Sequence, residues 1–351
     1  MIKLQEGVHK LLISSPSRLV GEYQDSCVLL SHAWSDNHAR FSEGPASRSA
    51  YIFVFETEEP ERAPGVVIQD YSPVGPMICS YLSVLFGKRF DTHGLTESQG
   101  LFRVPNLSQY LALADHRLPH NSHKIRRSPE VSLDLGQFKS LAPLLNAGSV
   151  DKQVLQTFQS ASKFYWQSLQ TFESDPEVSY LHLINSGEVI SNFFEFPRSE
   201  LIDESLAEYF QEIEDKCNDG AKIVRAISGK MYSVRRRFVK SLLGLLDDNF
   251  YLGYETDESW KAMTKEDIKE RLLAAYDLRS KYLHTGAPFG SWVSRSFTNA
   301  EIQIGDPVIE NKELAKIIRR APTFLGLERV MRYCLLRFLH LNGIPMPSYF
   351  P

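Results

Sequence analysis

The sequence has little cysteine, and its four cysteines stand far apart. They are Cys27, Cys79, Cys217 and Cys334, and no two form a C-x-x-C pair. Neither a zinc knuckle nor a disulfide framework is therefore predicted. We expect reduced, mostly packed thiols, as in a cytosolic protein.

Long hydrophobic runs are also missing. The first residues lack an apolar run followed by a small-residue cleavage site, so no signal peptide is expected. No uninterrupted apolar stretch reaches the length of a membrane span. These two absences predict a cytoplasmic protein that does not enter a membrane.

An excess of positive charge is absent too. The chain has 39 Lys and Arg against 43 Asp and Glu, a formal net charge of −4. No global basic field attracts nucleic acid, so any RNA site has to be a local patch.

The length of the chain predicts two domains. Its 351 residues are enough for two cores. Residues 1–147 favour a mixed α/β or β-rich domain, for which we expect a sensor or regulatory role. The polar stretch 117–130 is expected to be a surface loop. Strands are predicted at 27–30, 49–55 and 65–68, and a helix at 76–90.

Residues 148–351 have a different character, because amphipathic stretches follow one another with short breaks. Asp175 and Thr264 are placed to cap helix N-termini, and Gly220 and Gly286 to end helices. The second region is therefore predicted to be an all-α bundle, and the fold class α+β. Helices are expected at 150–172, 176–194, 197–218, 233–247 and 264–285, with one or two more within 311–341.

The most informative motif lies at the end of the helix expected from residue 264. Arg279 and His284 are separated by four residues and are followed by Gly286. Arginine binds phosphate through a planar fork of donors, and histidine exchanges a proton near neutral pH. In a straight helix the two side chains are roughly 140° and ~7.5 Å apart. A frayed last turn or a second copy of the helix across a two-fold axis is needed to bring them together.

This pattern resembles the HEPN superfamily of ribonucleases, and within it the HEPN domains of ApeA-type anti-phage proteins. The segment 276–286 resembles the family's motif helix. Segments 180–190 and 234–239 resemble an earlier helix with an acidic residue and a basic helix. The resemblance covers about the last 200 residues. It implies a dimeric helical bundle that cleaves RNA without a metal or other cofactor, often in abortive infection.

The resemblance also implies roles for individual residues. Arg279 and His284 would be catalytic, with Ser280 beside them and Glu188 orienting either one. Ser280 departs from the pattern, since many members have Asn, Asp or His at that position, and the help of a hydroxyl is weaker. RNA binding is expected from five basic residues of these helices: Arg235, Arg236, Arg237, Lys240 and Lys281.

Plainer interpretations stand beside these. Arg279 could pair with an acid and His284 lie near the negative end of the helix dipole. The basic run from Arg235 could be a solvated face that pairs with the acidic segment at 200–215. The histidines at 116, 120 and 123 have loose metal-like spacing, but a polar loop is favoured and no metal site is predicted.

The resemblance thus implies a homodimeric, metal-independent endoribonuclease that acts in anti-phage defence or as a growth-arresting toxin. A phage-derived trigger is expected at residues 1–147. The alternative is a non-catalytic HEPN-like module that dimerises or binds nucleotide and acts with a partner. A third possibility is a helical scaffold in which Arg279 is purely structural.

Overall fold

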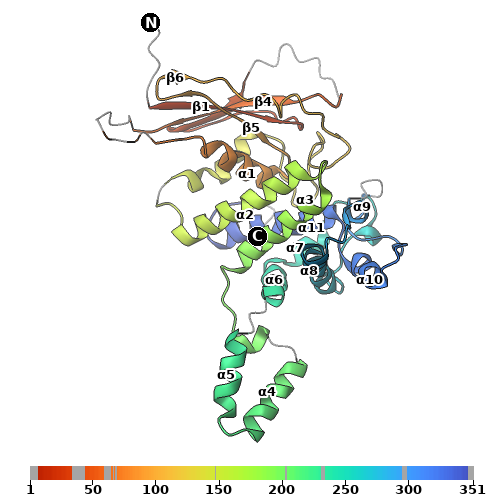
Figure 1. Cartoon of the computed structure of the whole chain (residues 1–351). Helices are drawn as coiled ribbons and strands as arrows, with labels where there is room; N and C mark the ends of the chain where they lie inside the picture. The colour runs from red at the N-terminus through yellow and green to blue at the C-terminus, as the bar shows by residue number, and fades with distance from the viewer. Residues whose placement is uncertain are drawn as a thin grey trace.

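The computed structural model describes residues 7–33, 44–58, 65, 67, 69–146, 148–201, 204–230, 234–294 and 299–346. It is an α+β structure, with an antiparallel sheet region followed by a mostly helical region (Figure 1). The predicted fold class is therefore confirmed.

Six strands form the sheet, in the order β2-β3-β4-β1-β5-β6, and every neighbouring pair is antiparallel. The predicted strands at 27–30 and 49–55 are present as β3 and β4. Of the predicted strand at 65–68, only Gly65 and Val67 lie among the described residues, and neither belongs to a strand. The bounds are β1 Val8–Ser15, β2 Tyr23–Gln24, β3 Val28–His32, β4 Ser49–Glu56, β5 Asp91–Ser98 and β6 Leu101–Phe102.

One face of the sheet supplies the first part of the core. On the central strand β1, Leu11 and Ile13 are fully buried, and they pair with Phe53 and Tyr51 of β4. Alternate residues of a strand share a face, so these four side chains lie on the same side. Helix α1 (Val74–Phe86) packs on β1 and β5, beneath the sheet in the view of Figure 1.

The helical region follows from residue 148 and contains the predicted helices. Asp151, Asp175 and Asn311 cap α2, α3 and α10 by accepting hydrogen bonds from backbone N–H groups. The α-helices are α2 Lys152–Thr171, α3 Pro176–Ser191, α4 Glu204–Lys216, α5 Gly220–Lys230, α6 Val234–Leu245, α7 Asp248–Leu252, α8 Ile268–Thr285, α9 Gly290–Val293, α10 Lys312–Arg320 and α11 Phe324–Leu341. Short 3₁₀ helices span Leu135–Ser140, Ala142–Leu145, Arg198–Leu201 and Ser259–Lys261.

Helix α8 carries the motif. The prediction is wrong for its N-terminal end and correct for its C-terminal end. It begins at Ile268 with Asp267 as its N-cap, so the prediction that Thr264 caps it is wrong. The Thr264 N–H instead donates to the Asp267 carboxylate (2.9 Å). The C-terminal end is confirmed: Gly286 has a φ of 65°, and its N–H donates to the Tyr282 carbonyl. Glycine suits this position because it adopts the left-handed conformation without a steric cost.

The sheet and helical regions share one hydrophobic core. Buried side chains from β1, α1, α2, α3 and α11 belong to a single cluster. Arg332 of α11 is fully buried and donates to the carbonyls of Val84 and Leu85, at the C-terminal end of α1. A cation there compensates for the negative end of the helix dipole. The predicted division after residue 147 therefore falls between regions that are packed together, and their status as separate domains stays a prediction.

The expectation that 117–130 is a surface loop is wrong for much of its length. Arg126 is 2 % exposed and forms two hydrogen bonds with Glu328 of α11, of 3.0 and 2.5 Å. Its Nε lies 3.1 Å from a carboxylate oxygen of Glu255. The hydroxyl of Tyr165 also donates to Glu328. The loop is buried because its charges find partners about 130 and 200 positions away in the sequence, and such pairing leaves no pattern in the loop itself.

Helices α4 and α5 form a hairpin that projects from the rest of the molecule (Figure 1). The acidic helix was predicted, but Gly220 was expected to end it. In the structure α4 ends at Lys216 and Gly220 begins α5. No helix in the described part of the chain is both long enough and apolar enough to cross a membrane.

Candidate functional site

Arg279 lies on α8 facing α3, where it meets Glu188. Its Nη2 is 3.2 Å from Glu188 Oε2, and the two side chains are 25 % and 18 % exposed. Tyr276, one turn earlier on α8, donates its hydroxyl to Glu188 Oε1 (2.7 Å). Its ring centroid lies 5.3 Å from the Arg279 guanidinium. One carboxylate from α3 thus holds both an arginine and a tyrosine of α8.

Tyr276 is a member of this cluster that the sequence did not single out as a site residue. Burial, followed by the hydrogen bond to Glu188 and the negative charge of that carboxylate, raises the pKa of Tyr276 to about 12. The phenol therefore stays protonated at neutral pH and keeps donating to Glu188. The spacing of Tyr276 and Arg279, three residues apart on one helix, was the available signal.

His284 lies in the last turn of α8 and is exposed. The helix continues to Thr285, whose hydroxyl donates to the Lys281 carbonyl (2.7 Å). The frayed last turn that could have brought His284 towards Arg279 is therefore not present. Helical geometry keeps the two side chains of one chain roughly 140° apart around the axis.

Ser280 and Lys281 lie between these two residues, both half-buried. Lys281 Nζ is 3.3 Å from a Glu313 oxygen of α10. Ile268, Leu272 and Tyr276 of α8 are buried, whereas Leu283 is 56 % exposed. The end of α8 thus stands in solvent.

The basic residues of α6 are occupied by partners within the chain. Arg235 binds Asp277 of α8 (2.6 Å), and Arg236 donates to the Leu201 carbonyl (2.9 Å). Arg237 donates to the side chain of Asn192, and Lys240 pairs with Glu200. An RNA phosphate would have to replace these partners. Their assignment as RNA-binding residues remains a prediction. The pairing of Lys240 with Glu200 agrees with the alternative in which the basic run pairs with the acidic segment at 200–215.

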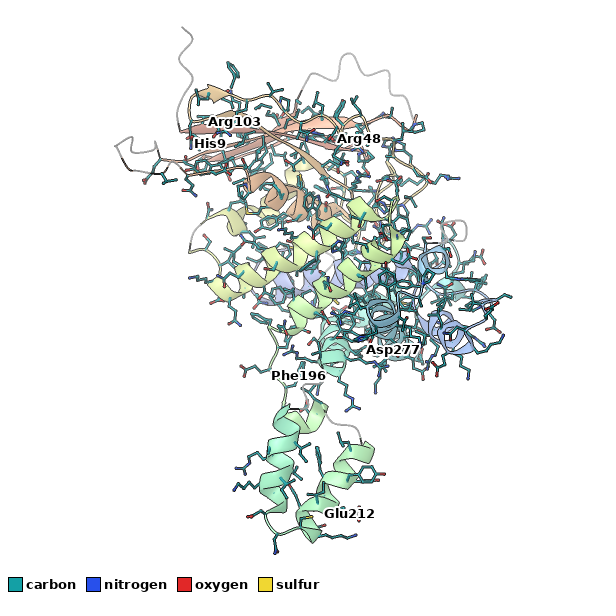
Figure 2. The ribbon with its side chains drawn as sticks, in the orientation of Figure 1. His9, Arg48, Arg103, Phe196, Glu212 and Asp277 are labelled. Carbon is teal, nitrogen blue, oxygen red and sulfur yellow. The ribbon has the colours of Figure 1, made fainter. Side chains whose placement is uncertain are left out.

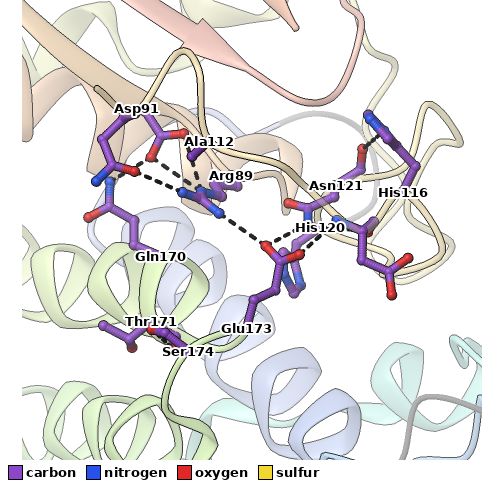
Figure 3. A network of polar contacts seen from close by, with 12 residues as sticks. Arg89, Asp91, Ala112, His116, His120, Asn121, Gln170, Thr171, Glu173 and Ser174 are labelled. Atoms are coloured by element: carbon purple, nitrogen blue, oxygen red, sulfur yellow. Dashed lines mark hydrogen bonds and ion pairs between the residues drawn. The ribbon is translucent and has the colours of Figure 1, made fainter. Parts of the chain in front are cut away.

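The histidine loop forms part of a separate polar network at the C-terminal end of α2 (Figure 3). Glu173 accepts hydrogen bonds from Arg89 (3.1 Å), Asn121 (3.2 Å) and the Asp115 backbone (2.7 Å). A hollow of about 810 Å³ borders Glu173, Asp115 and the histidines at 116 and 123. Asp115 is in turn held by Arg117 (2.8 Å). Both carboxylates are engaged, and the described residues contain no group of three or more His, Cys, Asp or Glu that could hold a metal ion.

His120 is the buried member of that loop, and the expectation of a polar surface histidine is wrong for it. It is 3 % exposed, and its Nε2 has no hydrogen-bond partner within the described residues. Burial, followed by the positive charges of Arg126, Arg89 and Lys88, holds the pKa of His120 well below its usual value, against the opposing charge of Asp115.

The stability of the protein should therefore fall as the pH drops. A depressed histidine pKa means that the folded chain stays neutral while the unfolded chain takes up a proton below about pH 6.5. The free energy of unfolding should then decrease by up to about 1.4 kcal/mol per pH unit for His120 alone. Denaturant unfolding between pH 7.5 and 5.5 measures this slope. A His120→Gln variant should show a shallower slope, and an unchanged slope would contradict the assignment.

No protein-family model, curated protein or solved structure matches this chain. The candidate site therefore rests on the geometry of α3, α6 and α8 and on the motif of α8.

Proposed function

We propose that the helical region is a metal-independent endoribonuclease of the HEPN type. The observation that carries the proposal is the arrangement on α8. Arg279 is held half-buried by Glu188 and Tyr276, while His284 stands exposed at the end of the same helix. A fixed phosphate-binding fork and an accessible proton-transfer group are the two parts that this cleavage needs.

In the proposed reaction, His284 removes the proton from a ribose 2′-OH, and that oxygen attacks the adjacent phosphorus. Arg279 binds the non-bridging oxygens as negative charge accumulates on them. A second His284 or a water molecule protonates the departing 5′-oxygen. The products are a 2′,3′-cyclic phosphate and a 5′-OH end.

The reaction as proposed takes place in a dimer. Because α8 is regular to Thr285, Arg279 and His284 of one chain do not converge on one atom. A second α8 across a two-fold axis would place two arginines and two histidines around a common groove. The cellular role suggested by analogy with the family is anti-phage defence or toxin-like growth arrest, triggered through residues 1–147.

The second candidate is a non-catalytic module that dimerises or binds nucleotide. The ion pair between Arg279 and Glu188 favours it, because a guanidinium already bound to a carboxylate has fewer donors for phosphate. Ser280, in place of the more common Asn, Asp or His, points the same way.

Substrate chemistry separates the two candidates. The nuclease should cleave an oligoribonucleotide in EDTA and leave a 2′,3′-cyclic phosphate. A matched oligonucleotide with one 2′-deoxyribose at the cleaved position should survive at that position, because the attacking hydroxyl is absent. Equal cleavage of both substrates would contradict the proposed chemistry, and cleavage of neither would favour the module.

A further inference from the structure

The α4–α5 hairpin has a tightly defined turn. Asp219 adopts a φ of 65°, in the left-handed region. Gly220 follows, and a Cβ atom added to it would lie 2.3 Å from the Ile213 carbonyl oxygen. Only glycine permits this approach, and it lets α5 start directly against the end of α4. The sequence at the turn therefore determines the hairpin, and α5 is a separate helix and not a continuation of α4.

The hairpin buries little of its own apolar surface. Among its described side chains only Phe210 falls in the buried class, at 7 % exposed, while Tyr209, Ile223 and Ile227 are 64, 40 and 39 % exposed. Ile223 and Ile227 are four residues apart, so they form one stripe on α5. Two helices of 13 and 11 residues are marginal in water without a tertiary partner.

The body of the molecule does not supply that partner in the described structure. Figure 2 shows Phe196 near the base of the hairpin and Glu212 at its far end, well away from the body. Among the described residues, no part of the body covers the exposed apolar side chains of the hairpin.

The two helices carry opposite charge, so a second copy of the hairpin is complementary to the first. Residues 204–216 contain five acidic residues and one lysine, whereas 220–230 contain three basic residues and no acidic one. A two-fold axis that sets α4 of one copy against α5 of the other brings acid against base on both sides. The same arrangement joins the apolar stripes in the centre of a four-helix bundle.

We propose that the α4–α5 hairpin is a self-association surface whose occupant is the same hairpin of a second copy of this chain. The four helices bury Tyr209, Ile223 and Ile227 between them, with the charged faces of α4 and α5 paired at the rim. In this proposal the hairpins and the α8 helices share the two-fold axis of a single dimer, and the hairpins supply most of the association. The interface does not rest on ribonuclease activity, because molecular mass and RNA cleavage are separate measurements.

The first test is the mass of the full chain in solution, measured by light scattering or sedimentation. The wild type should be a dimer at micromolar concentration. Replacing Ile223 and Ile227 by Glu should weaken association by about 100-fold or more, because charge is placed in an apolar interface. The same change at Leu252, which is 79 % exposed on the body, should leave the dimer intact. A monomeric wild type, or a dimer unaffected by the hairpin change, would overturn the proposal.

Charge exchange gives a second test that does not depend on weakening the hairpin. A chain with Lys222→Glu and Arg225→Glu has two acidic helices, and a chain with Glu208→Lys and Glu214→Lys has a much less acidic α4 beside a basic α5. Each should self-associate less than the wild type, and an equal mixture should form heterodimers. Absence of mixed dimers while either variant alone still dimerises would contradict the proposed pairing.

Discussion

Replacing Arg126 by Met should lower the free energy of unfolding by about 3–5 kcal/mol. The guanidinium is buried and forms hydrogen bonds with Glu328 and with the carbonyl of Gly87, beside the carboxylate of Glu255. Its removal leaves two carboxylates in the interior without their shared cation. The loss is measurable by denaturant unfolding followed by circular dichroism.

Arg117 supplies the matched control, because it lies in the same loop and also pairs with an acid. Its side chain is 76 % exposed, and its partner Asp115 is 30 % exposed. Replacing Arg117 by Met should change stability by no more than about 1 kcal/mol, as is usual for surface ion pairs. Equal effects of the two changes would show that Arg126 does not join the sheet and helical regions in the way the structure indicates.

Replacing Arg279 by Ala should reduce RNA cleavage by about 10²–10³-fold, the usual effect of removing one stabiliser of a developing oxyanion. The melting temperature should change little, because Glu188 keeps its hydrogen bond from Tyr276 and is partly exposed. Single-turnover cleavage and thermal unfolding of the same preparation measure both effects.

Arg271 is the control for Arg279, since it lies on the same helix and pairs with Asp267 (2.7 Å). Arg271→Ala should retain the cleavage rate of the wild type. A structural scaffold would give the opposite pattern for Arg279→Ala, namely a clear loss of stability. That outcome would move the interpretation of Arg279 from phosphate binding to packing.

Local signals in the sequence predicted much of the helical region. Asp175 caps α3, and Gly286 ends α8, both as predicted. Each signal depends on residues within one or two turns, and such short-range chemistry can be read from a sequence. Residues 49–55 were predictable as a strand for the same reason, from their β-branched and aromatic content.

Interactions between distant residues were not predictable. From the sequence alone, Arg126 is expected to be a surface arginine in a polar loop. Only the fold shows that Glu255 and Glu328 lie beside it. Gly220 resembles a helix terminator, and only its closeness to the Ile213 carbonyl shows that it begins the next helix. At the candidate site, Arg279 and Glu188 were both named in advance, whereas the role of Tyr276 emerged only when α3 and α8 were placed side by side.

The most direct test of the central claim is incubation of the purified protein with total RNA in EDTA, beside a His284→Ala variant. His284 is exposed, so the variant should keep the melting temperature of the wild type. The account predicts cleavage by the wild type alone, with 2′,3′-cyclic phosphate ends. No cleavage by either protein, even with lysate of phage-infected cells as a source of trigger, or equal cleavage by both, would contradict it.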